Sequence, residues 1–420
     1  MCPPPLRPPL TLLFSIRTNL RRLVKSWLFA INAIWAIPAV VLIRTVRFWV
    51  RVRIGRIDYL RIGGFVLGSS IFLARSSLQL QNERTIDLFW LPKWTCNEQW
   101  ARMVRRQLLV RWWVRYVMFF NRIIPGGAVH DLGCPTSTAE WGIYSILRQS
   151  TTRFEFTFEE EVAAKAWLRS RGWQDGELFV CLAVRDSAYL SSSPLHARDN
   201  REFWSYHNYR DSDIDTYVES VQALIDKGYW VIRVGKIAHK RLSLRHPRVI
   251  DYPFVDDQDD LMDIWLGANC RFCISTGTGI DTIPTVYGRH GTVVNLLPLK
   301  TVFSAVNQLT VPKKLRWKDS GRLLTLTEHC NNGYYRTKDY EQAGIAIEDL
   351  LPAEITAAVL ESEQRVAGTW VETVEDRTRQ RHFWAVFRNW RDFHNVHGNI
   401  HPEARVGCAW LKSMGDAFLE

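Results

Sequence analysis

Short apolar runs alternate with helix-like segments over the second half of the chain, and this pattern predicts a parallel β-sheet. The apolar runs at 178–184, 229–235, 248–254, 271–276 and 292–298 have the length of buried strands. Helices are expected between them at 213–228, capped by Asp211 or Ser212, at 259–270 and from 277 onward. Strands alternating with helices describe a doubly wound α/β domain, which we place at residues 176–330.

A similar but less regular pattern precedes this domain. Residues 50–63 predict a strand that runs into a turn at Gly63 and Gly64, 85–91 a second strand and 96–109 a helix. We assign residues 50–155 to a first Rossmann-like domain and 156–175 to an interdomain helix. Residues 331–420 are expected to form a helical tail that packs back on the first domain.

The first 49 residues have a different pattern and predict a membrane-associating segment. Residues 26–43 are uncharged and contain Pro38, and ten Lys or Arg residues precede position 60. The stretch is short for a membrane span and has no small-residue cleavage site. Basic flanks with tryptophans favour a helix that lies in the membrane interface, while a span and a buried core helix remain alternatives. Residues 105–124 predict a second amphipathic helix, which either docks on lipid or packs on its own domain.

Composition narrows the class of protein. With 420 residues, 47% of them hydrophobic and 23% charged, the chain has enough apolar sequence for two or three folded domains, and intrinsic disorder is excluded. The net charge of +11 is concentrated near the N-terminus, which argues against nucleic-acid binding by the remainder. Eight scattered cysteines are typical of a reducing compartment. Cys270 and Cys273 have the spacing of half a zinc site, but no second pair accompanies them, so no metal is expected.

Candidate binding residues follow the predicted strands. Ligands of open parallel sheets bind beyond the carboxyl ends of the strands. Two arginines, a lysine and a Gly/Ser/Thr turn that opens a helix are typical of a diphosphate site, although each alone also fits a tight turn or a salt bridge. The residues at these ends are Arg185, Asp186, Ser187, Arg233, Gly235, Lys236, Asp251, Tyr252, Phe254, Ser275, Thr276, Gly277, Thr278 and Gly279.

A loop and the helix after the turn supply further candidates. His207, Tyr209 and Arg210 lie in the loop after the first strand of this domain. We expect Arg185, His207 and Arg210 to be catalytic, with the two arginines neutralising the diphosphate. Tyr252 or Phe254 would flank the base, and Asp281 would hold a sugar or ribose hydroxyl. The aspartates at 256–260 fit a helix N-terminus better than a metal site.

These segments resemble a family of bacterial glycosyltransferases from surface-polysaccharide and cell-envelope loci. The matching segments are 156–161, 179–190, 206–217, 228–236, 246–254 and 263–284, with looser matches at 53–63 and 406–411. The resemblance implies a GT-B-like α/β architecture, in which two Rossmann-like domains face a cleft, the acceptor binds the first and the nucleotide donor the second. It also implies metal-independent catalysis without a cofactor. Relatives carry a histidine where this chain has Gly64, and His130 beside Asp131 is a possible substitute.

The sequence thus predicts a glycosyltransferase that moves a sugar from a nucleotide-diphosphate donor to a lipid-linked or cell-surface glycan acceptor. Its expected location is the cytoplasmic face of the bacterial inner membrane, as a peripheral or monotopic protein on an anionic surface. Two alternatives are a nucleotide-sugar epimerase of the related two-domain type and a non-catalytic membrane scaffold with a transferase fold.

Overall fold

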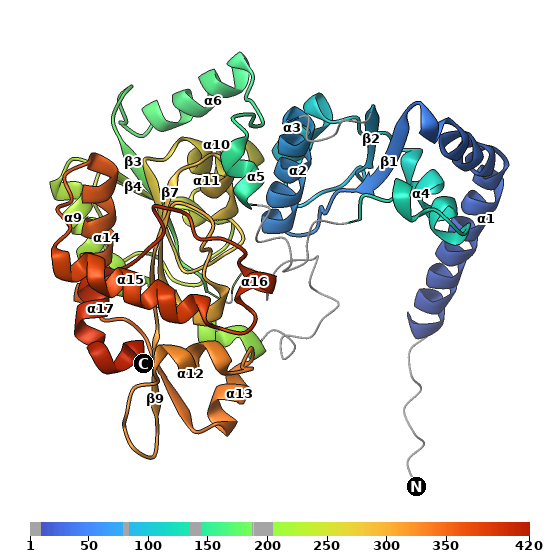
Figure 1. The fold of residues 1–420 in the computed structure, drawn as a ribbon. Coiled ribbons are helices and arrows are strands. Elements are labelled where there is room, and N and C mark those ends of the chain that lie inside the picture. Colours follow the sequence, from blue (N-terminus) through green and yellow to red (C-terminus); the bar gives the residue numbers. More distant parts are fainter. Residues whose placement is uncertain (1–9, 79–83, 134–143, 187, 189–204) are drawn as a thin grey trace, which may run out of the picture. The chain divides into compact units, whose positions relative to one another are not determined.

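Two compact units interleave along the chain. The computed structural model describes residues 10–78, 84–133, 144–186, 188 and 205–420, and Figure 1 shows their fold. Unit 1 comprises residues 1–57, 79–93 and 108–134, and unit 2 comprises 58–78, 94–107 and 135–420. The predicted boundaries at 50 and 155 differ from this division. Helices α2 (Ile62–Ser77) and α3 (Glu98–Gln107) were assigned to the first domain, but they belong to unit 2 because they pack on helices α11 (Thr282–Val286) and α10 (Asp260–Asn269).

Unit 1 is built on a pair of parallel strands. Strands β1 (Arg51–Arg56) and β2 (Thr85–Trp90) pair along their whole length, and Arg53 and Asp87 form an ion pair of 2.7 Å across them. Helix α1 (Leu10–Thr45), the short helix η1 (Val46–Phe48) and helix α4 (Val114–Ile123) complete the unit together with η2 (Ala128–His130). Within the described part of unit 1 the sheet has these two strands, so the expected first Rossmann-like domain is reduced to a single strand pair.

The prediction of one amphipathic helix at 105–124 is wrong. Helix α3 ends at Gln107, and the chain then passes along β2 before α4 begins. The Phe89 amide donates to the Leu109 carbonyl at 2.9 Å, and the Arg111 amide donates to the Phe89 carbonyl at 2.9 Å. These bonds hold residues 109–111 in an extended conformation, and the two helices consequently fall in different units.

Unit 2 contains a parallel sheet of seven strands in the order β11-β8-β7-β6-β3-β4-β5. The predicted doubly wound sheet is confirmed, with all five expected strands in place. Two more strands extend the sheet beyond β7. Strand β8 is buried beside β7, and β11 is a two-residue strand at the edge. The strands are β3 (Phe179–Ala183), β4 (Trp230–Arg233), β5 (Val249–Asp251), β6 (Phe272–Ser275), β7 (His290–Leu296), β8 (Gln308–Pro312) and β11 (Arg405–Val406).

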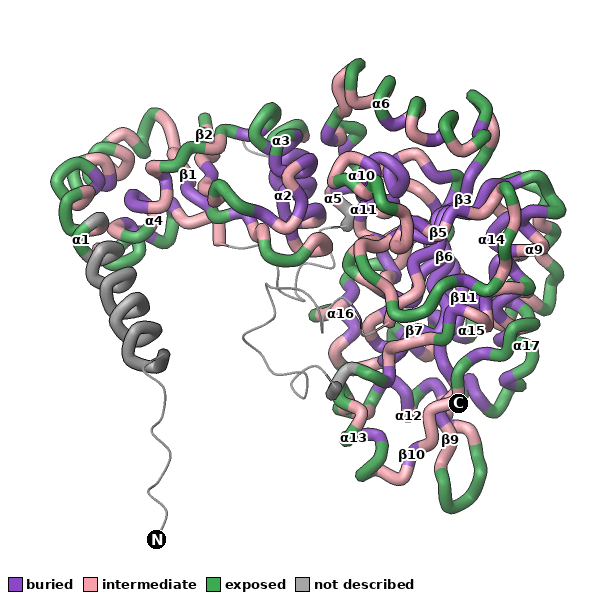
Figure 2. The backbone as a smooth tube through the Cα atoms, turned by 180° about the vertical axis from the view of Figure 1, so that it is seen from behind, coloured by how far each residue is buried: buried purple, intermediate pink, exposed green. Residues whose placement is uncertain are grey.

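Helices cover both faces of this sheet. Alternate residues of β3 point to opposite faces: Val180 and Leu182 pack with α9 and α14, while Phe179 and Cys181 pack with α6 and α10. Figure 2 shows the buried strands between these layers. Among the described residues, the other helices of unit 2 are α5 (Tyr144–Gln149), α6 (Phe158–Arg169), α9 (Val218–Asp226), α12 (Leu326–Asn331), α13 (Thr337–Gln342), α14 (Pro352–Ala367), α15 (Val374–Arg388), α16 (Phe393–Val396) and α17 (Cys408–Met414). The short helices described there are η4 (Ser205–Arg210), η5 (Ile214–Tyr217), η6 (Tyr252–Phe254), η7 (Leu299–Thr301) and η8 (Asp416–Leu419).

The C-terminal segment completes unit 2. Helix α14 packs on α9 and β7, and β11 extends the seven-stranded sheet. Phe383 and Phe387 of α15 are fully buried in the same core as Val180 and Leu182. This corrects the expectation that residues 331–420 return to the N-terminal domain, because the apolar faces of these helices are buried on the sheet. Strands β9 (Lys314–Trp317) and β10 (Ile345–Glu348) form a separate antiparallel pair.

Candidate functional site

The strand order places the candidate site at the point where the sheet changes direction. From β3 the chain moves outward through β4 to β5 and then returns to β6 on the other side of β3. Open α/β sheets bind ligands at such a switch point, beyond the carboxyl ends of the two strands. Arg185 follows β3, and the turn Thr276–Gly279 follows β6. Two of the predicted groups of residues therefore meet at this edge.

The two strand ends are joined by backbone hydrogen bonds. The Arg185 amide donates to Thr276 Oγ1 at 3.0 Å, and the Thr276 amide donates to the Ala183 carbonyl at 3.3 Å. The Ser212 amide donates to the Arg185 carbonyl at 3.1 Å. These contacts fix the backbone from which the Arg185 side chain extends.

The backbone amides of the glycine turn are held by the side chains of Ser275 and Asp281. Ser275 Oγ accepts from the Gly277 amide at 3.0 Å and donates to Asp281 Oδ2 at 2.6 Å, and that carboxylate also accepts from the Thr278 amide at 2.9 Å. Gly277 has a φ of 75°, which favours glycine. The amides of Thr276, Gly277 and Thr278 are thus engaged within the protein. Phosphate binding by this turn stays a prediction, and the neighbouring side chains are the further candidates for binding an anion.

Two arginines converge beside this turn. Arg185 Nε lies 3.1 Å from Asp211 Oδ1, and Arg210 donates to the Gly277 carbonyl. Burial lowers the pKa of the Arg210 guanidinium, and the charge of Arg185 lowers this pKa further. Burial also raises the pKa of Asp211, against the opposing charge of Arg185. No ion pair of Arg210 occurs among the described residues, so this guanidinium is desolvated without a direct carboxylate partner.

Asp211 was expected to cap the following helix and instead pairs with Arg185. The capping residue is Asp213, whose side chain accepts from the Asp215 amide at 3.1 Å at the start of η5. Ser212, the other expected cap, lies with its Oγ 3.1 Å from the Tyr217 hydroxyl and accepts from Asn295 Nδ2 at 2.9 Å. These three consecutive polar residues therefore have three different partners. Asp and Ser are similarly favoured as helix N-caps, so the sequence alone does not show which of the three caps the helix.

Asp281 is buried under the turn. Burial raises the pKa of its carboxyl to about 6, while hydrogen bonds from Ser275 and Thr278 and the charge of Arg210 oppose the shift. The expected role in binding a sugar or ribose hydroxyl finds no support in these contacts. In the structure the Oδ2 atom supports the turn that receives Arg210.

The residues after β4 and β5 form a separate buried network. Arg233 is 2% exposed, lies 3.3 Å from Asp251 Oδ1 and donates to the Lys240 carbonyl at 2.6 Å. Asp251 Oδ2 accepts from the Leu242 amide at 2.8 Å, and Asp186 Oδ2 accepts from the His239 amide at 2.9 Å and lies 3.7 Å from Arg233. Arg233 and Asp251 hold the loop after β4, which turns at Gly235 with a φ of 133°, and their predicted part in donor binding stays a prediction.

Lys236 and Tyr252 also have protein partners. Lys236 Nζ lies 2.5 Å from Asp260 Oδ1 and 3.4 Å from Asp263 Oδ2. The Tyr252 hydroxyl donates to the Asp259 carbonyl at 2.9 Å, and its ring is fully buried. Donor binding by Lys236 and Tyr252 stays a prediction, and in the structure both side chains serve contacts within the protein. Asp259 caps α10 by accepting from the Met262 amide at 2.7 Å, which confirms the acidic cluster as a helix N-terminus.

The remaining predicted residues are dispersed. The Tyr209 side chain is 6% exposed and packs against Tyr340 at a ring distance of 5.5 Å, in the core near β9. The Phe254 ring lies under the guanidinium of Arg241 at 4.3 Å. Ser187 lies outside the described residues, as does the side chain of His207 in η4.

Sequence reasoning missed a third cation at the switch point. Lys313 directly follows β8, is 3% exposed and donates to the Asp211 carbonyl at 2.8 Å. Its ammonium also lies 2.6 Å from Asp349 Oδ1. The signal was present as a lysine after the apolar residues 309–312, but that segment was not assigned as a strand.

Gly64 lies at the start of α2 beside Asp58. A Cβ atom on Gly64 would lie 2.5 Å from Asp58 Oδ2, so the flexible Asp58 side chain would have to turn away to admit a histidine. Gly63 packs against Gly279, and a Cβ atom on Gly63 would lie 3.1 Å from the Gly279 Cα, which leaves no room for a side chain without a shift. His130 is not the expected substitute: it is buried with Nδ1 2.6 Å from the Val52 carbonyl, while Asp131 pairs with Arg122.

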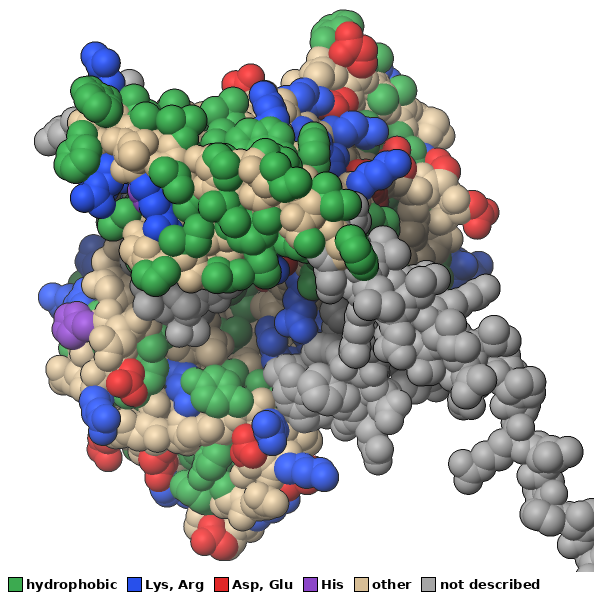
Figure 3. All heavy atoms as spheres, turned by 90° about the vertical axis from the view of Figure 1, so that its right-hand side faces the viewer, with side chains coloured by type: hydrophobic (Ala, Val, Ile, Leu, Met, Phe, Trp, Pro, Cys, Tyr) green, Lys and Arg blue, Asp and Glu red, His purple; other side chains and the backbone are tan. Residues whose placement is uncertain are grey.

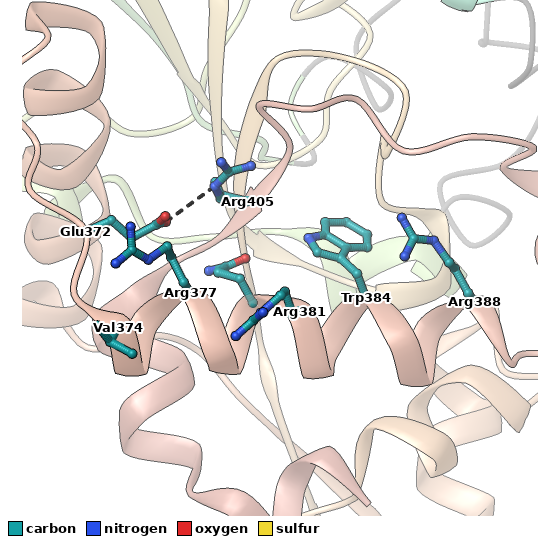
Figure 4. Close-up of a pocket in the computed structure, with 8 residues that line it drawn as sticks. Glu372, Val374, Arg377, Arg381, Trp384, Arg388 and Arg405 are labelled. Atoms are coloured by element: carbon teal, nitrogen blue, oxygen red, sulfur yellow. Dashed lines mark ion pairs between the residues drawn. The ribbon is translucent and has the colours of Figure 1, made fainter.

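A groove lies elsewhere on unit 2, along α15. Its volume is about 760 Å³, and Arg377, Arg381, Trp384 and Arg388 of this helix line it together with Arg405 of β11 (Figure 4). None of the predicted site residues that the structure describes lines it. No cluster of three or more His, Cys, Asp or Glu side chains suited to a metal ion occurs within the described ranges.

Comparisons with known proteins give distant structural matches. No protein-family model matches the chain, and no curated protein matches it. A glycosyl transferase family 9 structure from Veillonella parvula has a TM-score of 0.39 at 8% identity, covering 62% of this chain and 85% of that chain. The E. coli ADP-heptose lps heptosyltransferase II has a TM-score of 0.35 at 12% identity, covering 59% of this chain and 86% of that chain. Likeness at this level does not by itself assign an activity.

Proposed function

We propose that the chain is a glycosyltransferase that transfers a sugar from a nucleotide-diphosphate donor to a lipid-linked or cell-surface glycan acceptor. The observation that carries this proposal is the pair Arg185 and Arg210 at the switch point of the sheet. Arg210 is desolvated beside a second guanidinium and has no ion pair among the described residues. A bound diphosphate would compensate this charge through paired charge-assisted hydrogen bonds.

The two arginines would act on the leaving group. In the transfer, the bond between the sugar C1 and the diphosphate oxygen breaks, and a bond forms between C1 and an acceptor hydroxyl oxygen. Negative charge builds on the diphosphate as it leaves, and prepositioned guanidinium groups stabilise this charge. The hydroxyl proton must pass to a base, and we propose His207, which the sequence predicts to be catalytic, for this role. Metal independence remains a part of the proposal, since the two cations would supply the charge that a metal supplies in other enzymes.

The proposed location follows from the donor and from the cysteines. The six described cysteines are free thiols, as expected for the cytoplasm, where nucleotide sugars are made. We therefore propose the cytoplasmic face of a bacterial inner membrane, where a lipid-linked acceptor is available. The acceptor would engage residues outside the donor site described above.

A nucleotide panel tests the donor site. We expect one of UDP, GDP, ADP or CMP to raise the Tm of the full chain, because binding to the folded state stabilises it. Arg210→Ala should abolish the Tm shift and Arg185→Ala should lower turnover by about 10²-fold. Arg169→Ala, which removes an exposed arginine paired with Asp175, serves as the matched control and should behave as the wild type.

Three results would contradict the proposal. Equal nucleotide stabilisation of wild type and Arg210→Ala would show that the anion binds elsewhere. Absence of any nucleotide effect would favour the non-catalytic scaffold. Conversion of the nucleotide sugar without an acceptor would favour the epimerase.

A further inference from the structure

The outward face of α1 is apolar along four helical turns. Trp27, Ile31, Ile34 and Val41 recur at helical spacing, and their exposed fractions are 68%, 57%, 78% and 53%. A helix on the surface of a water-soluble protein carries polar residues on this side. The uncharged stretch 26–43 carries apolar residues on the exposed side as well as on the packed side.

The opposite side of α1 is packed within unit 1. Ala36 and Val40 are fully buried in a cluster with Val114 and Val117 of α4. Arg44 donates to the Ile124 carbonyl at 2.9 Å and to the Pro125 carbonyl at 2.7 Å, just beyond the end of α4. The two helices therefore form one body, and α4 adds further exposed apolar residues to it.

We call the exposed apolar residues of the two helices the insertion face: Trp27, Ile31, Ile34 and Val41 of α1 with Phe119 and Ile123 of α4. The Phe119 ring lies 4.6 Å from the ring of Phe29, which joins the α4 residues to α1. Figure 3 shows a side of the molecule on which apolar side chains gather with arginines at the margin. Such a contiguous apolar surface marks an interaction site.

The charge of unit 1 identifies the kind of partner. Residues 1–57, 79–93 and 108–134 contain fifteen Lys or Arg residues and three Asp or Glu residues, an excess of twelve positive charges. The whole chain has a net charge of +11, so unit 2 contributes none of the excess. Two of the three acidic residues, Asp87 and Asp131, are paired with arginines. An apolar face on a unit with this charge fits an anionic lipid surface.

The packing distinguishes insertion into the interface from a membrane span. Residues Phe29–Phe48 are long and apolar enough to cross a bilayer. A span would draw the packed side of α1 into the hydrocarbon, and with it the guanidinium of Arg44 and the amide of Asn121. Charged and polar side chains are strongly disfavoured there.

We propose that the insertion face enters one leaflet of an anionic membrane, with α1 lying along the interface and both of its ends on the same side. The apolar side chains of the insertion face contact the lipid acyl chains, and the surrounding arginines bind lipid phosphates. This docking mode is independent of the transferase activity.

Vesicle flotation with the full chain tests the proposal. The wild type should float with vesicles of phosphatidylcholine and phosphatidylglycerol, and the double variant Ile34→Asp with Val41→Asp should bind at least about tenfold more weakly. Both residues are exposed, so the variant should keep the wild-type Tm. Val371→Asp, at a site 82% exposed in unit 2, is the matched control and should bind as the wild type. Equal flotation of the double variant, or lipid-free dimerisation that the double variant abolishes without any vesicle binding by the wild type, would overturn the proposal.

Protease access tests the orientation of α1. In sealed membrane vesicles that display unit 2 outward, added protease should remove a tag placed before residue 10. Protection of that tag while unit 2 is digested would show a span and overturn the interfacial mode.

Discussion

Asp281 shows how one buried carboxyl can support a charged site. Its carboxylate accepts hydrogen bonds from the Ser275 hydroxyl and the Thr278 amide, beneath the turn to which Arg210 donates. Burial nevertheless raises the pKa of Asp281 to about 6, above the value of an unfolded chain. The turn is therefore maintained against the cost of ionising an acid in a desolvated position.

Asp281→Asn should change how stability depends on pH. Because the folded pKa exceeds the unfolded value, the folded chain holds more protons between pH 4 and 6, so the contribution of Asp281 to stability is lost as the pH rises through about 6. Relative to the wild type, the variant should gain up to about 3 kcal/mol in unfolding free energy between pH 4 and 7. Urea unfolding at a series of pH values measures this difference.

Asp263, whose pKa burial also raises to about 6, is retained in both proteins and cancels in the comparison. A constant difference between variant and wild type across this range would show that Asp281 titrates normally. The Ser275 and Thr278 donors can still bind the amide oxygen of asparagine, so the turn itself should persist.

At the scale of elements, Arg44 adds hydrogen bonds to the apolar contacts between α1 and α4. Arg44 donates to the carbonyl of Asn121 in the last turn of α4 and to the carbonyls of Ile124 and Pro125 just beyond it. These carbonyls have no partner within a helix, so a cation at this position is stabilising.

Arg44→Ala should weaken the α1–α4 pair by about 1–3 kcal/mol, because it leaves part-buried carbonyls without a donor. We expect faster hydrogen exchange of the α4 amides, measured by mass spectrometry on the full chain. Arg47→Ala is the control: this exposed arginine has its guanidinium 5.0 Å from the ring centre of Phe48 and no contact with α4 among the described interactions. Exchange that rises equally in both variants would argue against the coupling.

At the scale of the whole molecule, positive charge is segregated into unit 1. Unit 2 is close to neutral, and two of its three cations at the switch point, Arg185 and Lys313, are paired with Asp211 and Asp349. The charge of unit 1 would attract anionic lipid over a long range, whereas the cations at the switch point of unit 2 would bind an anion locally.

Vesicle binding should accordingly depend on salt. Raising NaCl from about 0.05 to about 0.5 M shortens the Debye length roughly threefold, and affinity for anionic vesicles should fall by on the order of tenfold or more. Binding to neutral vesicles, which measures apolar insertion, should change little. Equal salt dependence on both lipids would indicate that the charge excess has no part in docking.

The sequence by itself determined the elements and their chemistry. Each predicted strand of unit 2 formed because its apolar run has the length and flanking turns of a buried strand. The interdomain helix predicted at 156–175 likewise formed as α6, where Thr157 and Glu160 make a capping box. The uncharged N-terminal helix and its basic flanks were also readable, since they depend on local composition.

Only the tertiary structure decided which strand-end residues act together. Arg185 and Arg210 meet because β6 inserts beside β3, whereas Arg233 and Lys236 one strand away are neutralised by Asp251 and Asp260. The same long-range packing engaged the turn amides and moved α2 and α3 into unit 2. Strand order and distant partners depend on contacts between segments far apart in the chain, and a local pattern of polar and apolar residues does not encode them.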